Sequence, residues 1–195
     1  PQRVKRNADA KVGDRLILGK PLGVGILSAA LKQEKLDAAG YERMLTVTTQ
    51  LNTPGPELAA LAGVHALTDV TGFGLAGHAL ELARGAHCAV QMDWAKVPLI
   101  AGVHALASAG MVTGASGRNW AAYGHEIALP VGFAAADQAL LSDPQTSGGL
   151  LVSCAAEAVD AVLDIFTRHG FAEAAEVGRV VDAASEPTGT ALRVA

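Results

Sequence analysis

Apolar residues recur with two different periods along the chain, and the two periods alternate from segment to segment. Short apolar or alternating runs predict buried strands at 14–20, 65–69, 86–94, 150–154 and 175–181. Longer runs with apolar residues three and four positions apart predict helices at 23–34, 38–50, 57–62, 73–83, 98–109, 134–141 and 155–169. This alternation predicts the α+β class, an α/β sandwich with helices over a mixed β-sheet.

Two segments lack either period. Residues 110–124, rich in Gly, Ser and Asn, are predicted to form a long loop that is either mobile or functional. Residues 142–149, SDPQTSGG, predict a tight turn before a buried strand. No internal repeat interrupts the pattern, and 195 residues suffice for one large domain or two small ones.

Composition and charge narrow the classes of function. Half of the chain is hydrophobic but only 4% is aromatic, which predicts a core of Ala, Leu and Val. The net charge of −4 argues against a nucleic-acid binder. Basic residues gather at the amino end, where a solvated segment is favoured over a phosphate-facing arm; they are Arg3, Lys5, Arg6, Lys11 and Arg15.

The positions of the cysteines and the hydropathy of the chain indicate in which cellular compartment the protein is expected. Cys88 and Cys154 each lie in an apolar run, which predicts buried thiols and a reducing cytoplasm. The longest apolar candidate, residues 150–166, contains three acidic residues and is not expected to span a membrane. The chain begins at Pro1 without Met, and we interpret it as a fragment rather than as a product of Met removal.

Glycines after the first predicted strand raise the question of a nucleotide loop. Gly23 and Gly25 form G-x-G, but Ser28 replaces the third glycine of a dinucleotide fingerprint. A P-loop is excluded as well, because Pro21 replaces the required Ser or Thr after Lys20. Any ATP chemistry must therefore use another kind of site.

Asp69 in ALTDVTGFGLAGH stands at the carboxyl end of a predicted strand, just before a glycine-rich turn. Ligand groups of α/β sheets are commonly placed there, and Mg²⁺ takes one or two protein oxygens beside water and phosphate. Capping of the following helix by Asp69 or Thr71 is the alternative, and both interpretations are open.

Two further stretches carry polar groups. Thr146 and Ser147 in SDPQTSGG offer hydroxyls and amides to an anion, although a simple turn explains them too. Residues 118–125 combine Arg, Asn, Trp, Tyr and His, which favours either substrate binding or a hydrophobic plug. The six histidines form no metal-binding motif.

Taken together, these stretches resemble one family. RVKRNADAKVGD, KPLGVGILSAA, ALTDVTGFGLAGH, TGASGRNWAAYG and LLSDPQTSGGLLVSC are similar to selenophosphate synthetases (selenide, water dikinases), in the same order and nearly end to end. TDVTGFGL and DPQTSGGL also resemble the wider aminoimidazole-ribonucleotide-synthetase-like superfamily. One departure is Gly19, where the family commonly has Thr; we expect it to affect packing rather than chemistry.

The resemblance implies a single carboxyl-terminal domain, 1–195, of a two-domain enzyme, with residues 1–13 joining it to an absent amino-terminal domain. Such enzymes convert selenide, ATP and water to selenophosphate, AMP and phosphate with Mg²⁺, usually as homodimers. Their amino-terminal domain supplies the reactive Cys or selenocysteine, a catalytic Lys and further Asp ligands. This chain is therefore expected to hold no catalytic residue and to be inactive alone.

By the resemblance, Asp69 is the magnesium ligand of this domain. The phosphate side of the cleft is expected to be lined by Thr68, Gly72, Asn119, Thr146 and Ser147. The expected partners are ATP and selenide, without nucleic acid or membrane, in the cytoplasm. Two alternatives stay open: an interaction module without an ATP site, and another ATP-dependent enzyme of the same superfamily.

Overall fold

Residues 4–195, the part of the chain that the computed structural model describes, form a seven-stranded sheet and eight α-helices. The strands are β1 Arg15–Leu18, β2 Val64–Asp69, β3 Ala89–Met92, β4 Ile127–Ala128, β5 Leu150–Cys154, β6 Ala175–Val181 and β7 Leu192–Val194. The helices are α1 Val24–Lys32, α2 Ala38–Thr49, α3 Gly55–Ala60, α4 Gly74–Ala86, α5 Val103–Ser108, α6 Gly114–Tyr123, α7 Ala135–Leu141 and α8 Val159–Arg168. The predicted α+β class is confirmed.

The sheet is mixed, with the strand order β2-β5-β1-β6-β3-β7-β4. Neighbours from β2 to β3 are antiparallel, whereas β7 runs parallel to β3 and to β4. Asp69 is paired with Leu150, and Leu18 with Leu151. The ends of β1 and β2 therefore meet the start of β5 at one end of the sheet.

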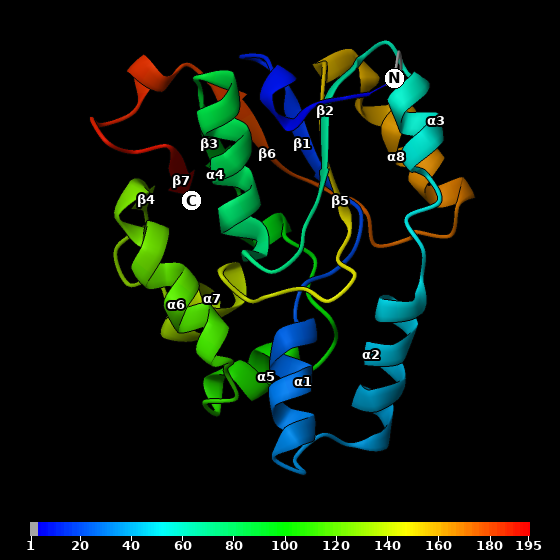
Figure 1. The fold of residues 1–195 in the computed structure, drawn as a ribbon, viewed down its shortest axis with the longest axis vertical. Coiled ribbons are helices and arrows are strands. Elements are labelled where there is room, and N and C mark those ends of the chain that lie inside the picture. Colours follow the sequence, from blue (N-terminus) through cyan, green and yellow to red (C-terminus); the bar gives the residue numbers. More distant parts are fainter. Residues whose placement is uncertain (1–3) are drawn as a thin grey trace.

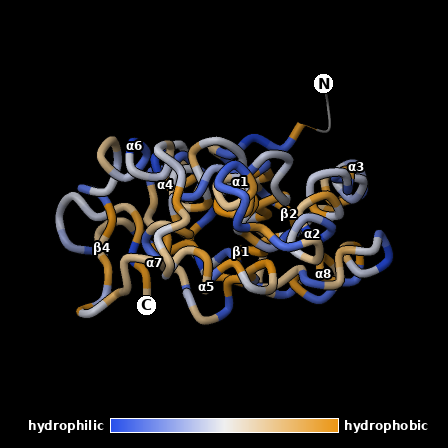
Figure 2. The backbone as a smooth tube through the Cα atoms, turned by 90° about the horizontal axis from the view of Figure 1, so that it is seen from below, coloured by the Kyte–Doolittle hydropathy of each residue, from blue (hydrophilic) through white to orange (hydrophobic). Residues whose placement is uncertain are grey.

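Helices cover the two faces of this sheet (Figures 1 and 2). Leu16 and Leu18 of β1 point to the α4 side, whereas Ile17 between them packs on the opposite side with Phe166 of α8. This alternation is the period of two that a strand buried on both faces requires. A Cβ atom on Gly19 would lie 2.5 Å from the Phe166 ring, so glycine leaves room for that ring.

A third apolar cluster lies past the end of the sheet where β1 and β2 end. It joins α1, α2 and α5, seen together at the bottom of Figure 1, through side chains such as Ile26, Met44 and Val103. These helices place their backbone next to the loops that follow β1 and precede β5.

The predicted loop 110–124 is wrong, because most of it forms α6. Thr113 caps this helix, its hydroxyl accepting a hydrogen bond from the Ser116 amide at 3.1 Å. Within α6 only Ser116 and Tyr123 are buried, so no apolar stripe marks the helix in the sequence. The Tyr123 hydroxyl donates to the Phe73 carbonyl at 2.6 Å and so ties α6 to the turn before α4.

The predicted helix 98–109 begins later than expected. Leu22 donates to the Pro98 carbonyl and accepts from Ile100, both at 2.9 Å, so this segment is extended. α5 begins only at Val103, after Gly102 in the left-handed region with φ 85°. The helical interpretation fails over 98–102 because these backbone groups are paired with the β1–α1 connection.

In the amino-terminal segment, Arg6 and Lys11 are exposed, while the residues between them pack on α4. Arg3 lies outside the described residues, but Arg6 pairs with Asp9 at 2.6 Å, and Ala8 packs so closely on α4 that a Cβ atom on Gly85 would lie 3.0 Å away. No helix within residues 4–195 combines the length and apolarity that a membrane span needs.

Candidate functional site

Asp69 is the last residue of β2 and is exposed. Within residues 4–195 its carboxylate forms no hydrogen bond or ion pair, so both oxygens are free to bind a ligand. Helix capping, the alternative role, is not seen, since α4 has no side-chain cap.

Two loops that are far apart in the sequence meet beside Asp69. The Val70 amide donates to the Gly149 carbonyl at 2.9 Å, and the Gln145 amide donates to the Thr71 carbonyl at 3.0 Å. A Cβ atom on Gly148 would lie 2.0 Å from the Val70 carbonyl oxygen, so only glycine permits this approach. The stretches TDVTG and DPQTSGG therefore form one continuous surface.

The side chain of Asn119 in α6 forms hydrogen bonds with backbone groups next to this surface. Its Nδ2 donates to the Gly72 carbonyl at 2.8 Å and to the Ser142 carbonyl at 3.1 Å. Asn119 thus joins the loop after β2 to the loop after α7. The structure places Asn119 next to Gly72, where its side chain connects two loops.

Thr146 and Ser147 are both exposed at the tip of the second loop. Ser147 adopts a left-handed conformation with φ 61°, which is uncommon for a residue other than glycine. Thr68 is half-buried on β2 and, by strand alternation, points to the face opposite Asp69. The structure therefore gathers Asp69, Gly72 and Ser147 at one edge and leaves Thr68 turned away.

Lys20 anchors the second loop from inside the protein. Its side chain is 1% exposed, and Nζ donates to the carbonyls of Gln50, Ser147 and Val47 at 2.6, 2.8 and 3.1 Å. Gln50 and Val47 belong to the carboxyl end of α2, where carbonyls lack helical partners and attract cations. Burial lowers the pKa of Lys20.

Asp143 and Gln145 hold the same loop against α1. Asp143 Oδ2 accepts from the Gly25 and Ile26 amides at 2.9 and 3.3 Å, and Gln145 Oε1 accepts from the Gly23 amide at 3.2 Å. These side chains supply the acceptors that the start of a helix needs. Burial raises the pKa of Asp143 to about 7, although hydrogen bonds from Ile26, Gln145 and Gly25 oppose that shift.

Sequence reasoning missed these anchors. The G-x-G at Gly23 and Gly25 has a packing reason, because a Cβ atom on Gly25 would lie 2.3 Å from Asp143 Oδ1. The Asp-Pro pair belongs to the turn segment that the sequence predicts. No local pattern, however, indicates that Asp143 caps a helix more than a hundred residues earlier in the chain.

The arrangement fits a magnesium ion held by one oxygen of this chain. No group of three or more His, Cys, Asp and Glu residues within 4–195 is placed to hold a metal ion. Mg²⁺ needs only one or two carboxylates when water and phosphate complete its shell. A nearby hollow of about 500 Å³ is lined by Gly19, Thr46 and Phe171 among others, and Asp69 is not part of it.

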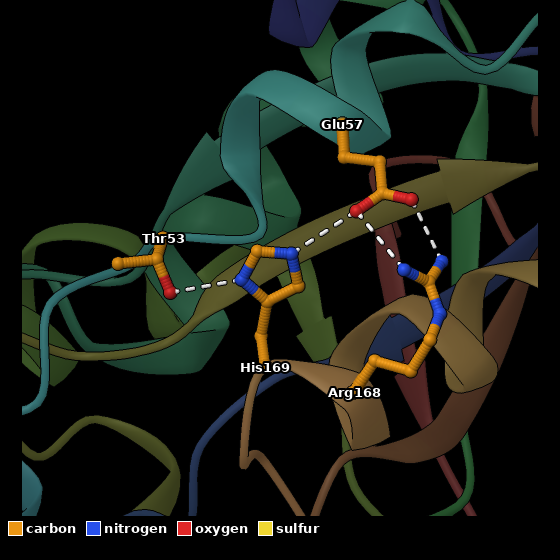
Figure 3. Close-up of polar contacts among 4 residues, drawn as sticks. All are labelled: Thr53, Glu57, Arg168 and His169. Carbon is orange, nitrogen blue, oxygen red and sulfur yellow. Dashed lines mark hydrogen bonds and ion pairs between the residues drawn. The ribbon is translucent and has the colours of Figure 1, made fainter.

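A second polar cluster lies away from this edge (Figure 3). His169 contacts Thr53 Oγ1 through Nδ1 at 3.1 Å and Glu57 through Nε2 at 3.0 Å. Arg168 forms an ion pair with the same carboxylate at 2.7 Å, and both partners lower the pKa of Glu57. These contacts lie at the surface, and they join α3 to the end of α8.

Comparison with known proteins agrees with this fold. The family model described as "AIR synthase related protein, C-terminal domain" matches residues 11–187. Among solved structures, E. coli HypE has a TM-score of 0.67 at 20% identity, over 97% of this chain and 48% of that one. At that identity the likeness shows the fold alone.

Curated relatives are much closer in sequence. Proteins named selenide, water dikinase from Burkholderia pseudomallei (strain K96243) and Pseudomonas straminea are 63% and 64% identical over 185 and 180 residues. The matches cover 95% and 92% of this chain, but only 52% and 50% of those proteins. The chain spans about half the length of these relatives. It therefore belongs to the family of AIR synthase related carboxyl-terminal domains, and it is such a domain of the selenophosphate synthetase type.

Proposed function

We propose that the intact protein is a selenide, water dikinase, which converts selenide, ATP and water to selenophosphate, AMP and phosphate. The identity of 63% to proteins of that name supports this activity. The structural observation that carries the role of this domain is the exposed, unpartnered Asp69 carboxylate between two anchored loops. Asp69 is the ligand that this domain contributes to Mg²⁺.

Each part of the edge has a proposed task. When bound, Mg²⁺ supplies positive charge that neutralises the triphosphate and the charge developing during phosphoryl transfer. Asp69 holds the metal side of the nucleotide, while the exposed residues Thr146 and Ser147 face the phosphates; the Ser147 hydroxyl also lies 3.5 Å from Lys20 Nζ. Gly72 lies at this edge and Asn119 supports it by joining two loops, whereas Thr68 points to the opposite face and is left out of the proposed lining.

One carboxylate makes metal binding depend on a second domain. Because residues 4–195 hold no group of three or more metal-ligand side chains, we expect the remaining carboxylates to come from the other half of the protein, together with the reactive Cys or selenocysteine. Retention of the metal then requires the domains to close around the nucleotide. We therefore expect this domain alone to be inactive, and the intact enzyme to act as a cytoplasmic homodimer.

The decisive experiment replaces Asp69 with Asn in the intact protein. Selenide-dependent release of AMP should fall by about 100-fold or more, because a neutral amide is a poor magnesium ligand. The matched control is Asp164→Asn, an exposed carboxylate on α8 that belongs to neither of the two loops beside Asp69, which should keep its activity. Near-normal AMP release by the Asp69 variant would remove the metal role, and release of ADP instead of AMP would point to another enzyme of the superfamily.

A further inference from the structure

His78 lies in the second turn of α4 and is 6% exposed. Its Nε2 accepts a hydrogen bond from the Thr71 amide at 3.0 Å and lies 3.1 Å from the Thr71 hydroxyl. The ring also lies beside Phe73, with centroids 6.0 Å apart. A buried histidine thus reaches back to the loop that follows Asp69.

The direction of this hydrogen bond fixes the state of the ring. A backbone amide only donates, so Nε2 must carry its lone pair, and the proton of the neutral ring must be on Nδ1. Glu81 Oε2 lies 3.1 Å from Nδ1 and favours that tautomer by its charge, although the contact lacks the direction of a hydrogen bond. Nδ1 is otherwise buried without a partner.

The backbone of Asp69 is held on one side by its pairing with Leu150, and on the other by the residues that follow it. Because no side chain of the described residues holds the Asp69 carboxylate, its direction depends on this backbone. Val70 is held by the Gly149 carbonyl, and the Thr71 carbonyl is held by the Gln145 amide. The Thr71 amide is held by a side chain, that of His78. This contact determines how the chain turns away from β2 immediately after Asp69.

We propose that His78 is a positioning residue for the loop Asp69–Gly72, acting through the Thr71 amide. The inference rests on the proposed metal role of Asp69, since it explains how that carboxylate is aimed. His78 itself touches neither metal nor nucleotide. The Thr71 amide requires a hydrogen-bond acceptor at the position of Nε2, and this acceptor need not belong to an imidazole.

Two amide side chains separate these possibilities in the intact protein. Gln at position 78 places an oxygen near the place of Nε2, whereas Asn reaches only the place of Nδ1. His78→Gln should therefore keep the Mg²⁺ concentration for half-maximal AMP release within about twofold. His78→Asn leaves the part-buried Thr71 amide without its acceptor and should raise that concentration by about tenfold, the effect of one lost hydrogen bond.

Hydrogen exchange gives a readout that does not depend on activity. In the intact protein without Mg²⁺, peptides covering residues 70–73 should exchange about tenfold faster in His78→Asn than in His78→Gln, while peptides from β5 stay unchanged. Equal exchange and equal Mg²⁺ dependence in the two variants would overturn the proposal. If Asp69→Asn stays active while the exchange difference is seen, the loop contact stands and the metal role falls.

Discussion

Lys20 and Glu57 each hold together segments distant in the sequence, but they do so in opposite surroundings. Lys20 is 1% exposed and donates to three backbone carbonyls, whereas the Glu57 side chain is 42% exposed and pairs with Arg168 and His169 (Figure 3). Water competes freely for the contacts of Glu57, whereas the contacts of the buried Lys20 ammonium are buried or part-buried. The number of polar contacts is similar, so burial decides which of them determine the structure.

The largest effect should come from removing the buried ammonium. Lys20→Met keeps the length of the side chain but leaves the carbonyls of Val47, Gln50 and Ser147 without their donor. Because the ammonium is buried and its three hydrogen bonds are buried or part-buried, we expect a loss of about 3 kcal/mol in the free energy of unfolding. Chemical denaturation of the intact protein measures it, with the exposed Lys35→Met as control. Equal midpoints for the two variants would contradict the role of burial.

A smaller effect should follow pH through Asp143. Burial raises the pKa of its carboxyl from an ordinary value of about 4 to about 7, so the folded state favours the protonated form. Its contribution to stability is fully present below about pH 4 and is lost as the pH rises through 7.

The measurement compares the free energy of unfolding at pH 6 and pH 8. The protein should lose about 1 kcal/mol more than Asp143→Asn over this interval, because Asn does not titrate. A parallel pH dependence in both proteins would show that Asp143 is already ionised at pH 6.

The smallest effect is expected at the exposed cluster. Glu57→Gln removes the charge that faces Arg168 and His169, but water can solvate all three groups. We expect the denaturation midpoint to stay close to that of the unchanged protein and to depend less on salt. A loss comparable to that of Lys20→Met would mean that burial is not what separates the two regions.

The same distinction explains how far the sequence predicts the fold. β1, β2, β5 and β6 were predicted because each buries apolar side chains, and α8 because one face is apolar. α6 was missed because only two of its residues are buried and its start depends on the Thr113 cap. Hydrophobic periodicity reflects the burial of one face of an element, and α6 has few buried residues.

The candidate site was predictable only in part for a related reason. Asp69 and Ser147 stand in glycine-rich stretches that mark strand ends, and the structure brings these stretches together. The role of Lys20 was not predictable, because it acts through backbone groups of segments that are distant in the sequence and meet it only in the folded protein. The contact of His78 with the Thr71 amide lies within one sequence stretch, but neither periodicity nor turn chemistry indicates it.

The Phe166 ring occupies the space that a side chain at position 19 would need, and this contact couples two positions almost 150 residues apart. Restoring a Thr beside Lys20 requires a smaller side chain on α8, so the two sites are expected to change together during evolution. A chimera that exchanges the β1 region between this protein and a relative must therefore carry its matching α8, or the misplaced ring will displace the strand that leads to the buried lysine.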